Sequence, residues 1–249
     1  MKLYTKQETI DLFYGKMKNN ISNLYKDNCI NWSGRTKDTK EFYSEIIAQE
    51  LLLNLEELNV INILTRLSSY KIEGHAKVMI DHSTSTRAEE NFAKRLYGLN
   101  FDKLGEIIDY QVPLKNKSGD EGIGKIDLIS YYDTEQYLYL IELKFGDNKE
   151  TLLRAILESY TYFKIIDQDK LISDHSSHKL IANQNKKIKC LPAVMIVSAK
   201  TTNKQCNSFT ELNEMKKGER PMLKSLAKKL NIEFFGCELN AIFTNDYLK

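Results

Sequence analysis

The chain has 249 residues, 42% of them hydrophobic, and its 36 Lys and Arg nearly balance its 34 Asp and Glu, which leaves a net charge of +2. This length and apolar fraction predict one elaborated domain, or a core domain with a helical addition, around a sizeable buried core. The sequence shows neither a signal peptide nor the ~18 consecutive apolar residues of a membrane span. We therefore expect a soluble, cytoplasmic protein with no membrane partner.

The first part of the chain has a helical pattern. Apolar residues recur at helical spacing over residues 5–30 and again over residues 38–67. No residue group with a readable chemistry lies in this part. We predict that residues 1–82 form a helical subdomain or N-terminal elaboration, and that residues 83–249 form the domain that carries the site.

Residues 83–145 have the pattern of a helix followed by a β-meander. The helix is predicted over residues 87–97, with Gly98 at its end. Short polar connectors separate the three strand-like runs that follow, which predicts antiparallel neighbours. These runs cover residues 106–114, 124–132 and 137–145.

The second half of this region alternates helices with strands. A helix is predicted over residues 148–167, and the continuous apolar run at 190–198 predicts a strand that is buried on both faces. A basic helix near 219–230 and a strand over 232–239 follow. The order of elements indicates an α/β fold around a mixed central sheet.

The segment Ile141-Glu142-Leu143-Lys144 ends the third strand of the meander. Successive side chains of a strand point to opposite faces, so Glu142 and Lys144 share one face while Leu143 points into the core. A carboxylate and an ammonium group are then about 7 Å apart at the backbone.

A second carboxylate, Asp127, lies on the preceding strand. An antiparallel hairpin brings it beside Glu142, with Ile126 and Leu128 expected on the opposite face. Two carboxylates and a backbone carbonyl, that of Leu143, are the oxygen ligands that suit Mg²⁺ or Mn²⁺. The sequence therefore predicts a divalent metal site at the end of these two strands.

Such a site suits the hydrolysis of a phosphodiester bond, which needs an activated water and neutralisation of charge on the phosphoryl oxygens. Lys144 is expected to position the water or to neutralise that charge, and it acts as a base only if its pKa is lowered. The tripeptide alone is weak, because Asp38-Thr-Lys40 and Glu214-Met-Lys216 also match it. Only Lys144 follows an apolar strand with an acidic strand before it.

The run Gly124-Lys-Ile-Asp127, followed after fourteen residues by Glu142-Leu-Lys144, resembles the PD-(D/E)xK nuclease superfamily over roughly residues 83–200. The literal Pro-Asp pair of that family is absent, since Ile126 precedes Asp127. The resemblance implies a restriction-endonuclease-like α-β-β-β-α-β core, dependence on Mg²⁺ or Mn²⁺, and cleavage of nucleic acid, expected to be DNA, as an endonuclease.

The resemblance also implies a glutamate on the helix before the first strand. Glu89 fits best, because apolar residues follow it three, four and seven positions later, and Glu90 is the alternative. It would complete a catalytic set with Asp127, Glu142 and Lys144 and join the metal ligands. The candidates for substrate binding on the later helix are Arg154, Glu158, Tyr160 and Tyr162.

Charge is distributed unevenly along the chain. Residues 85–178 hold twelve Lys and Arg against seventeen Asp and Glu, whereas residues 179–230 hold twelve against three. An acidic region followed by a basic one suits an enzyme that gathers divalent cations beside a polyanion. A homodimer is also expected, since cutting two strands often needs two sites.

Alternatives to this interpretation stay open at the level of sequence. The acidic residues and Lys144 can form a surface charge cluster, and the chain can be a catalytically inactive nucleic-acid-binding or interaction protein on the same fold. The segment His175-Ser-Ser-His178 has the only ligand-like spacing of histidines, and we expect it in an exposed polar loop. The scattered cysteines are expected to be reduced and buried, namely Cys29, Cys190, Cys206 and Cys237.

Overall fold

Six strands form one mixed, curled sheet in the computed structural model, which describes residues 3–18, 20–75, 88–116, 124–182, 187–198 and 206–238. The strands lie in chain order, with antiparallel pairing from β1 to β4 and parallel pairing of β4, β5 and β6. This arrangement confirms the α/β class and the predicted meander. The strands are β1 (Asn100–Phe101), β2 (Gly105–Pro113), β3 (Lys125–Tyr132), β4 (Tyr137–Phe145), β5 (Lys189–Ser198) and β6 (Glu233–Glu238).

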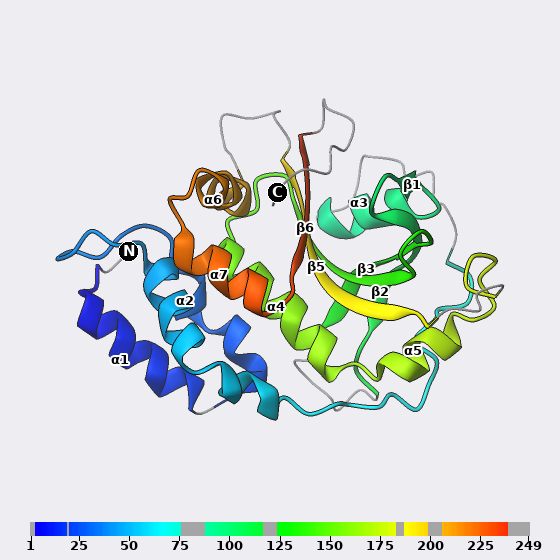
Figure 1. The fold of residues 1–249 in the computed structure, drawn as a ribbon, viewed down its shortest axis with the longest axis horizontal. Helices are drawn as coiled ribbons and strands as arrows, with labels where there is room; N and C mark the ends of the chain where they lie inside the picture. Colours follow the sequence, from blue (N-terminus) through cyan, green and yellow to red (C-terminus); the bar gives the residue numbers. More distant parts are fainter. Residues whose placement is uncertain are drawn as a thin grey trace.

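Helices cover both faces of the sheet (Figure 1). Helix α3 (Ala88–Leu96) packs on one face, against β2, β3 and β4, and agrees with the predicted helix within the described residues. Helix α4 (Leu152–Ile165) packs on the other face, against β4 and β5, and α5 (Gln168–Asp174) follows it. Strand β5 has buried side chains on both faces, as its apolar sequence predicted.

The N-terminal part of the chain is helical, but its helices are shorter than predicted. Helix α1 (Lys6–Met17) begins at a capping box and is followed by the 3₁₀ helices η1 (Ile21–Lys26) and η2 (Asn28–Asn31). Helix α2 (Tyr43–Leu53) is followed by η3 (Leu55–Val60).

Two polar side chains help to explain where these helices are interrupted. Asp27 has an extended backbone and its carboxylate accepts a hydrogen bond from Cys29 N at 3.1 Å, so it starts η2 rather than continuing a helix. Asn54 Nδ2 donates to the carbonyl of Glu50 at 2.8 Å, just after α2 ends. Such local side-chain bonds compete with a continuous helix. The prediction of two long helices was therefore wrong at these points.

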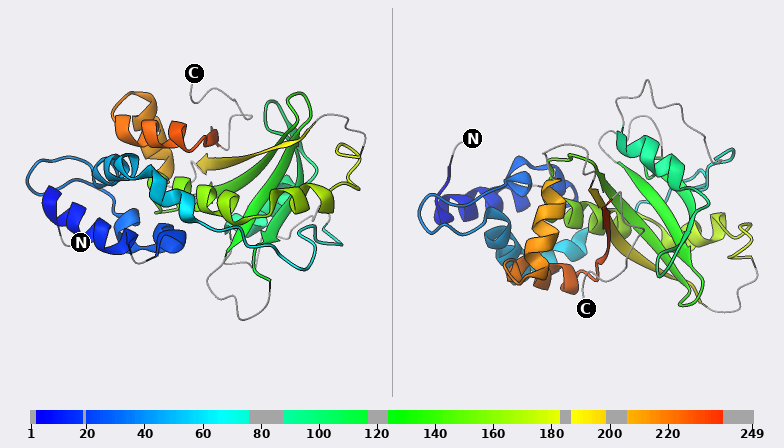
Figure 2. Two further views of the ribbon diagram at one scale, coloured as in Figure 1. Left: turned by 60° about the horizontal axis from the view of Figure 1, so that its bottom comes forward. Right: turned by 90° about the horizontal axis from the view of Figure 1, so that it is seen from above.

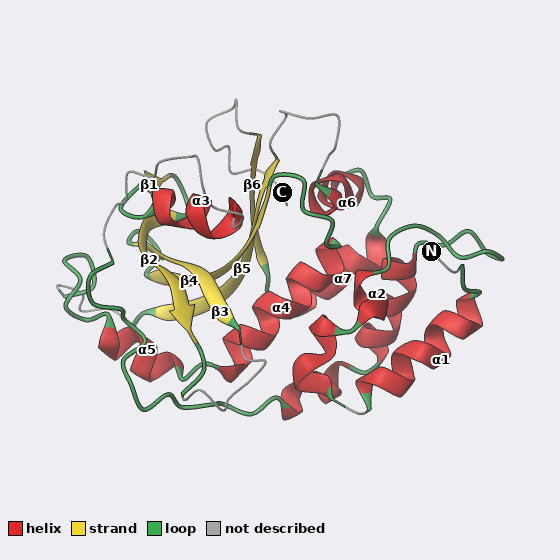
Figure 3. Ribbon diagram, turned by 180° about the vertical axis from the view of Figure 1, so that it is seen from behind, coloured by secondary structure: helices red, strands yellow, loops and turns green. Residues whose placement is uncertain are grey.

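The N-terminal helices share one buried cluster with α4 and with α7 (Pro221–Lys229), which follows α6 (Asn207–Lys216). Phe13 of α1, Leu51 of α2, Ile156 of α4 and Leu226 of α7 all belong to it. Figures 2 and 3 show α4 between these helices and the sheet. Among the described residues, no helix is both long enough and apolar enough to cross a membrane.

His175 is buried, contrary to the expected exposed loop. It follows α5, where its Nδ1 bonds the carbonyl of Leu171 at 2.9 Å and its Nε2 lies 3.0 Å from Asp109 Oδ2. His75 Nδ1 lies 2.6 Å from the other oxygen of Asp109. The carboxylate on β2 thus joins two distant histidines, which the local sequence around His175 does not indicate.

The cysteines follow the prediction where the structure describes them. Cys29, Cys190 and Cys206 are free and buried. The side chain of Cys237 lies outside the described residues.

Candidate functional site

The candidate site lies where β3 and β4 separate. Their ladder runs as far as the pair Leu128 and Ile141, and one more step of the same register would set Asp127 opposite Glu142. At this point Asp127 Oδ2 accepts a hydrogen bond from Leu143 N at 2.9 Å, so a side-chain acceptor replaces a backbone carbonyl of β3. The N–H and C=O of one strand residue face the same neighbour, and the carbonyl of Leu143 therefore also faces β3.

A bend in β2 and β3 shapes this end of the sheet. Gln111 has φ +49°, an uncommon and strained conformation for a residue other than glycine, and its Nε2 donates to Asp127 Oδ1 at 2.8 Å. Ile126 belongs to the buried cluster on the α4 side, whereas Leu128 belongs to the cluster on the α3 side. The expectation that they share one face was wrong, because the hairpin bends between them.

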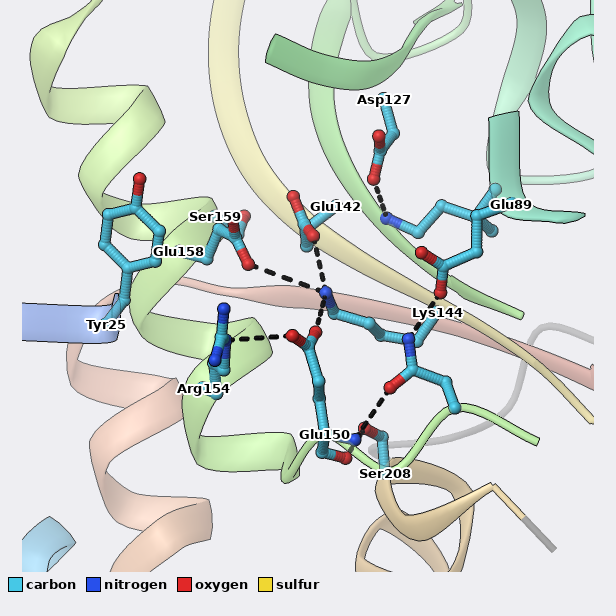
Figure 4. A network of polar contacts seen from close by, with 12 residues as sticks. Tyr25, Glu89, Asp127, Glu142, Lys144, Glu150, Arg154, Glu158, Ser159 and Ser208 are labelled. Carbon is cyan, nitrogen blue, oxygen red and sulfur yellow. Dashed lines mark hydrogen bonds and ion pairs between the residues drawn. The ribbon is translucent and has the colours of Figure 1, made fainter. Parts of the chain in front are cut away.

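Lys144 is surrounded by carboxylates (Figure 4). Its Nζ lies 2.7 Å from Glu142 Oε1 and 3.5 Å from Glu158 Oε2, and it also bonds Glu150 Oε2. The lysine is 3% exposed, so these contacts replace its hydration. Glu142 and Lys144 reach this point from one face of β4, as strand alternation predicted, and Glu158 reaches it from α4.

Burial and charge shift the protonation of these groups. Burial by itself lowers the pKa of Lys144, but the charges of Glu142, Glu158 and Glu150 outweigh it and the pKa is raised. The amine is therefore protonated and can donate hydrogen bonds but not accept a proton. Burial, together with the neighbouring acids, raises the pKa of Glu142. Burial raises the pKa of Asp127 to about 7, against the hydrogen bond from Leu143 N.

Helix α3 directs Glu89, rather than Glu90, to the site. Glu89 Oε1 accepts hydrogen bonds from Phe145 N at 3.1 Å and from Asn148 Nδ2 at 2.6 Å, at the end of β4. Glu90 forms an ion pair of 2.9 Å with Lys94, one turn further along the same helix. Glu89 is thus tied to the segment that follows Lys144.

The four candidates on α4 have different environments. Arg154 Nε forms an ion pair with Glu150 Oε1 at 3.0 Å, and Tyr162 Oη donates to Glu158 Oε1 at 2.8 Å. Arg154, Glu158 and Tyr162 therefore connect to the lysine cluster. Tyr160 packs its ring near Phe163, with the ring centroids 6.4 Å apart. In the described part of the chain, no hydrogen bond or ion pair joins it to the cluster.

Several residues of the site were not identified from the sequence. Glu150 is held by Asn148 Oδ1, which accepts from its N at 2.7 Å, and by Ser208 Oγ of α6, which donates to its carbonyl at 2.6 Å. The acidic residue just before the predicted helix was an available signal for Glu150. Gln111 and Tyr25, whose hydroxyl lies 3.3 Å from that of Tyr162, had no such signal, because tertiary packing alone brings them to the site.

Negative charge exceeds positive charge here. The carboxylates are Asp127, Glu142, Glu150, Glu158 and Glu89, and the cations are Lys144 and Arg154. Within the described ranges, no three His, Cys, Asp or Glu side chains are arranged to hold a metal ion. Glu142 contacts Lys144 instead, and Asp127 accepts hydrogen bonds from Gln111 Nε2 and Leu143 N. The donor set nevertheless contains the two carboxylates and the carbonyl that a hard cation prefers.

Comparison with known proteins gives no match for this chain among protein-family models, curated proteins or solved structures. The chemistry of the site therefore rests on its own residues. They offer a protonated amine, a surplus of carboxylates and a backbone carbonyl at the end of two strands.

Proposed function

We propose that this chain is a metal-dependent nuclease that hydrolyses phosphodiester bonds, with DNA as the expected substrate, on a restriction-endonuclease-like core. The observation that carries the proposal is the grouping of Asp127, Glu142 and Lys144 where β3 and β4 separate, with Glu89 tied to the same strand end. The order of elements supports it as well: apart from the two-residue strand β1 and the short helix α5, the run from α3 through β2, β3, β4 and α4 to β5 agrees with the α-β-β-β-α-β order that the resemblance implies.

Asp127, Glu142 and the Leu143 carbonyl are the groups that would hold Mg²⁺ or Mn²⁺, with Glu89 close to them. The surplus of carboxylates supports this assignment, because buried acids with raised pKa values are stabilised by a nearby cation. A divalent ion bound there supplies Lewis-acid polarisation of a phosphoryl oxygen.

The protein groups orient and neutralise the phosphodiester. The protonated Lys144 donates hydrogen bonds to a phosphoryl oxygen or to the attacking water, where charge builds up in the transition state. Glu150 and Glu158 limit the positions open to its ammonium group by contacting it from two sides. Arg154, which is paired with Glu150, is the candidate contact for a neighbouring phosphate.

Incubation of the purified protein with plasmid, single-stranded DNA, branched DNA and RNA in Mg²⁺ or Mn²⁺ tests the proposal. We expect cleavage by the wild type and its loss in Asp127→Asn, Glu142→Gln and Lys144→Met. Glu90→Gln is the matched control, because it changes a carboxylate next to Glu89 that pairs with Lys94 instead. No cleavage of any substrate by the wild type, or equal cleavage by Lys144→Met, contradicts the proposal.

Cleavage of both strands of a duplex by one site per chain is expected to involve a second copy. Sedimentation of the protein with and without duplex DNA measures whether a homodimer forms. A chain that stays monomeric while it cuts both strands at one position contradicts this part of the proposal.

Two observations favour a second candidate, a catalytically inactive nucleic-acid-binding or interaction protein on the same fold. Glu142 already pairs with Lys144, and the described residues contain no three-ligand group of His, Cys, Asp or Glu. Calorimetric titration with Mn²⁺ separates the two candidates. An active enzyme binds the ion in a manner that Asp127→Asn abolishes, whereas an inactive binder shows no such site.

A further inference from the structure

A buried chain of hydrogen bonds runs from the N-terminal helices to Lys144. Tyr25, in η1, donates its hydroxyl to Tyr162 Oη at 3.3 Å, and Tyr162 donates to Glu158 Oε1 at 2.8 Å. The other oxygen of Glu158 lies 3.5 Å from Lys144 Nζ. The rings of Tyr25 and Tyr162 meet edge to face, with centroids 5.6 Å apart. Figure 4 shows Tyr25 and Glu158 on the same side of the lysine cluster.

The direction of this chain follows from its end, because the Tyr162 hydroxyl donates its one proton to the Glu158 carboxylate and can only accept from Tyr25. Burial raises the pKa of both Tyr25 and Tyr162, so each phenol keeps its proton and remains a donor. The Tyr162 hydroxyl also occupies the space that a Cβ on residue 124 would need, which explains the glycine at that position. Gly124 and Tyr25 thus confine the hydroxyl that donates to Glu158.

The same N-terminal segment also holds the start of α4. Asn31 Oδ1 accepts a hydrogen bond from Thr151 N at 2.8 Å, and the carbonyl of Ile30 accepts from Thr151 Oγ1 at 2.8 Å. Thr151 is the N-cap of α4 and directly follows Glu150. The segment therefore holds α4 at two points, on either side of Arg154.

We infer that the segment of residues 21–31 is part of the framework of the active site, and that Tyr25 is a positioning residue that fixes Lys144 through Tyr162 and Glu158. This inference rests on the proposed nuclease function. It assigns a role to a region whose sequence carried no readable chemistry. Tyr25 does not touch the reacting groups itself; it restricts the carboxylate that contacts the ammonium group.

The test compares two tyrosines of the N-terminal region in the full chain. Tyr25→Phe removes the first donor, and Tyr14→Phe removes a similar bond, from Tyr14 Oη to Glu50 Oε2 at 2.7 Å, that belongs to α1 and α2. Since one hydrogen bond of ordinary net strength is removed, we expect Tyr25→Phe to lower kcat about threefold to tenfold with little change in KM. Tyr14→Phe should keep the wild-type kcat. Wild-type kcat in Tyr25→Phe, or an equal loss in both variants, overturns the inference.

A double-mutant cycle separates positioning from general stabilisation. If Tyr25 acts through Glu158, the double variant Tyr25→Phe/Glu158→Gln has the same kcat as Glu158→Gln alone, whereas independent effects multiply. Multiplying effects overturn the inference.

Urea unfolding of the four proteins of this cycle, the wild type, Tyr25→Phe, Glu158→Gln and the double variant, gives a readout that does not need activity. Residues in one hydrogen-bond network are expected to change the unfolding midpoint non-additively. If the wild type cuts no substrate but the midpoints are non-additive, the nuclease proposal fails and the positioning role of Tyr25 stands. Additive midpoints in an inactive wild type overturn both.

Discussion

Two buried cations in this protein, Lys144 and Arg220, have carboxylate partners but differ in how many carboxylates surround them. Arg220, at the start of α7, contacts Glu214 through Nε at 2.9 Å and Nη2 at 2.6 Å, and Glu211 lies 3.6 Å away. Its Nη1 bonds Ser44 of α2, and its guanidinium group lies 3.5 Å from the centre of the Phe42 ring. Each nitrogen of the planar group has a partner, and Nε and Nη2 share one oxygen, Oε2 of Glu214.

The surroundings of Lys144 contain a larger number of carboxylates. Glu142, Glu150 and Glu158 contact its single ammonium group, and Asp127 and Glu89 lie at the same strand end. The arginine cluster joins α2, α6 and α7, and two carboxylates contact its one cation. The lysine cluster, which includes Arg154, has five carboxylates for two cations, and this larger excess of acid favours a further cation. The size of the acid excess, more than burial, separates the structural cluster from the candidate active site.

The largest effect is expected from removing the arginine. Arg220→Met leaves Glu211 buried without its cation, and breaking a buried pair in this way costs about 3–5 kcal/mol of unfolding free energy. Urea unfolding measures this loss, while kcat per folded molecule should stay at the wild-type value. A loss of activity in the folded fraction contradicts the assignment of Arg220 to the structure rather than to the site.

The corresponding change at the lysine should affect catalysis most. If the chain is the proposed nuclease, Lys144→Met removes a donor directed at the charge that develops on the phosphodiester, and such donors contribute about 10²–10³ in kcat, or about 2.7–4 kcal/mol. Single-turnover cleavage of a labelled duplex measures the change. Circular dichroism of the variant shows whether the fold is retained, and retained cleavage in a folded variant argues against a role for the amine.

Divalent cations should distinguish the two clusters more finely. At 100 times its dissociation constant, Mn²⁺ is expected to raise the unfolding free energy by about 2.7 kcal/mol, because it binds the folded state only. Asp127→Asn should abolish this shift, and Glu214→Gln, in the arginine cluster, should keep it. Thermal unfolding with and without Mn²⁺ measures both, and a shift that survives Asp127→Asn places the cation elsewhere.

The smallest expected effect is a slope of stability with pH. Burial raises the pKa of Glu211 to about 7, against the opposing charge of Arg220 and the hydrogen bond from Leu152 N. Between its ordinary pKa of 4.5 and this value, the folded state holds a proton that the unfolded state has lost. The unfolding free energy therefore decreases as the pH rises from 4.5 to about 7 and stays constant at higher pH. Urea unfolding at pH 5, 6, 7 and 8 measures the slope, which Glu211→Gln should reduce.

Asp127 contributes to the same pH dependence of the unfolding free energy. Burial raises its pKa to about 7, which gives a slope of the same sign as that of Glu211. Mn²⁺ favours the ionised form of Asp127 and should remove only its share of the slope. Glu211, which lies in the arginine cluster, should keep its share. A slope that Mn²⁺ abolishes completely contradicts the separation of the two clusters.

The sequence was most informative where local pattern and structure have the same cause. Strand-like runs separated by short polar connectors placed β2, β3 and β4 to within a residue. The alternation of side chains along a strand put Glu142 and Lys144 together, and helical spacing favoured Glu89 over Glu90. These inferences need only the geometry of a strand or a helix.

The features of the fold and the site that the sequence did not predict depend on contacts between distant segments. The left-handed backbone of Gln111, which bends the sheet beside Asp127, has no signature in neighbouring residues. Tyr25 reaches Tyr162 only because η1 packs against α4. The burial of His175 depends on Asp109, which lies 66 positions earlier in the chain. In each case a tertiary partner decides the conformation or the environment.

The contact of Glu211 with the start of α4 has a consequence for biosynthesis. Glu211 Oε2 accepts a hydrogen bond from Leu152 N at 2.6 Å, and Ser208 holds the neighbouring Glu150. Translation proceeds from the N-terminus, so Tyr25 leaves the ribosome long before Tyr162. Both precede the residues of α6 that contact the first turn of α4. A chain that is still being translated lacks these contacts until residue 211 has emerged. The candidate active site is therefore expected to form late, when the described part of the chain folds together.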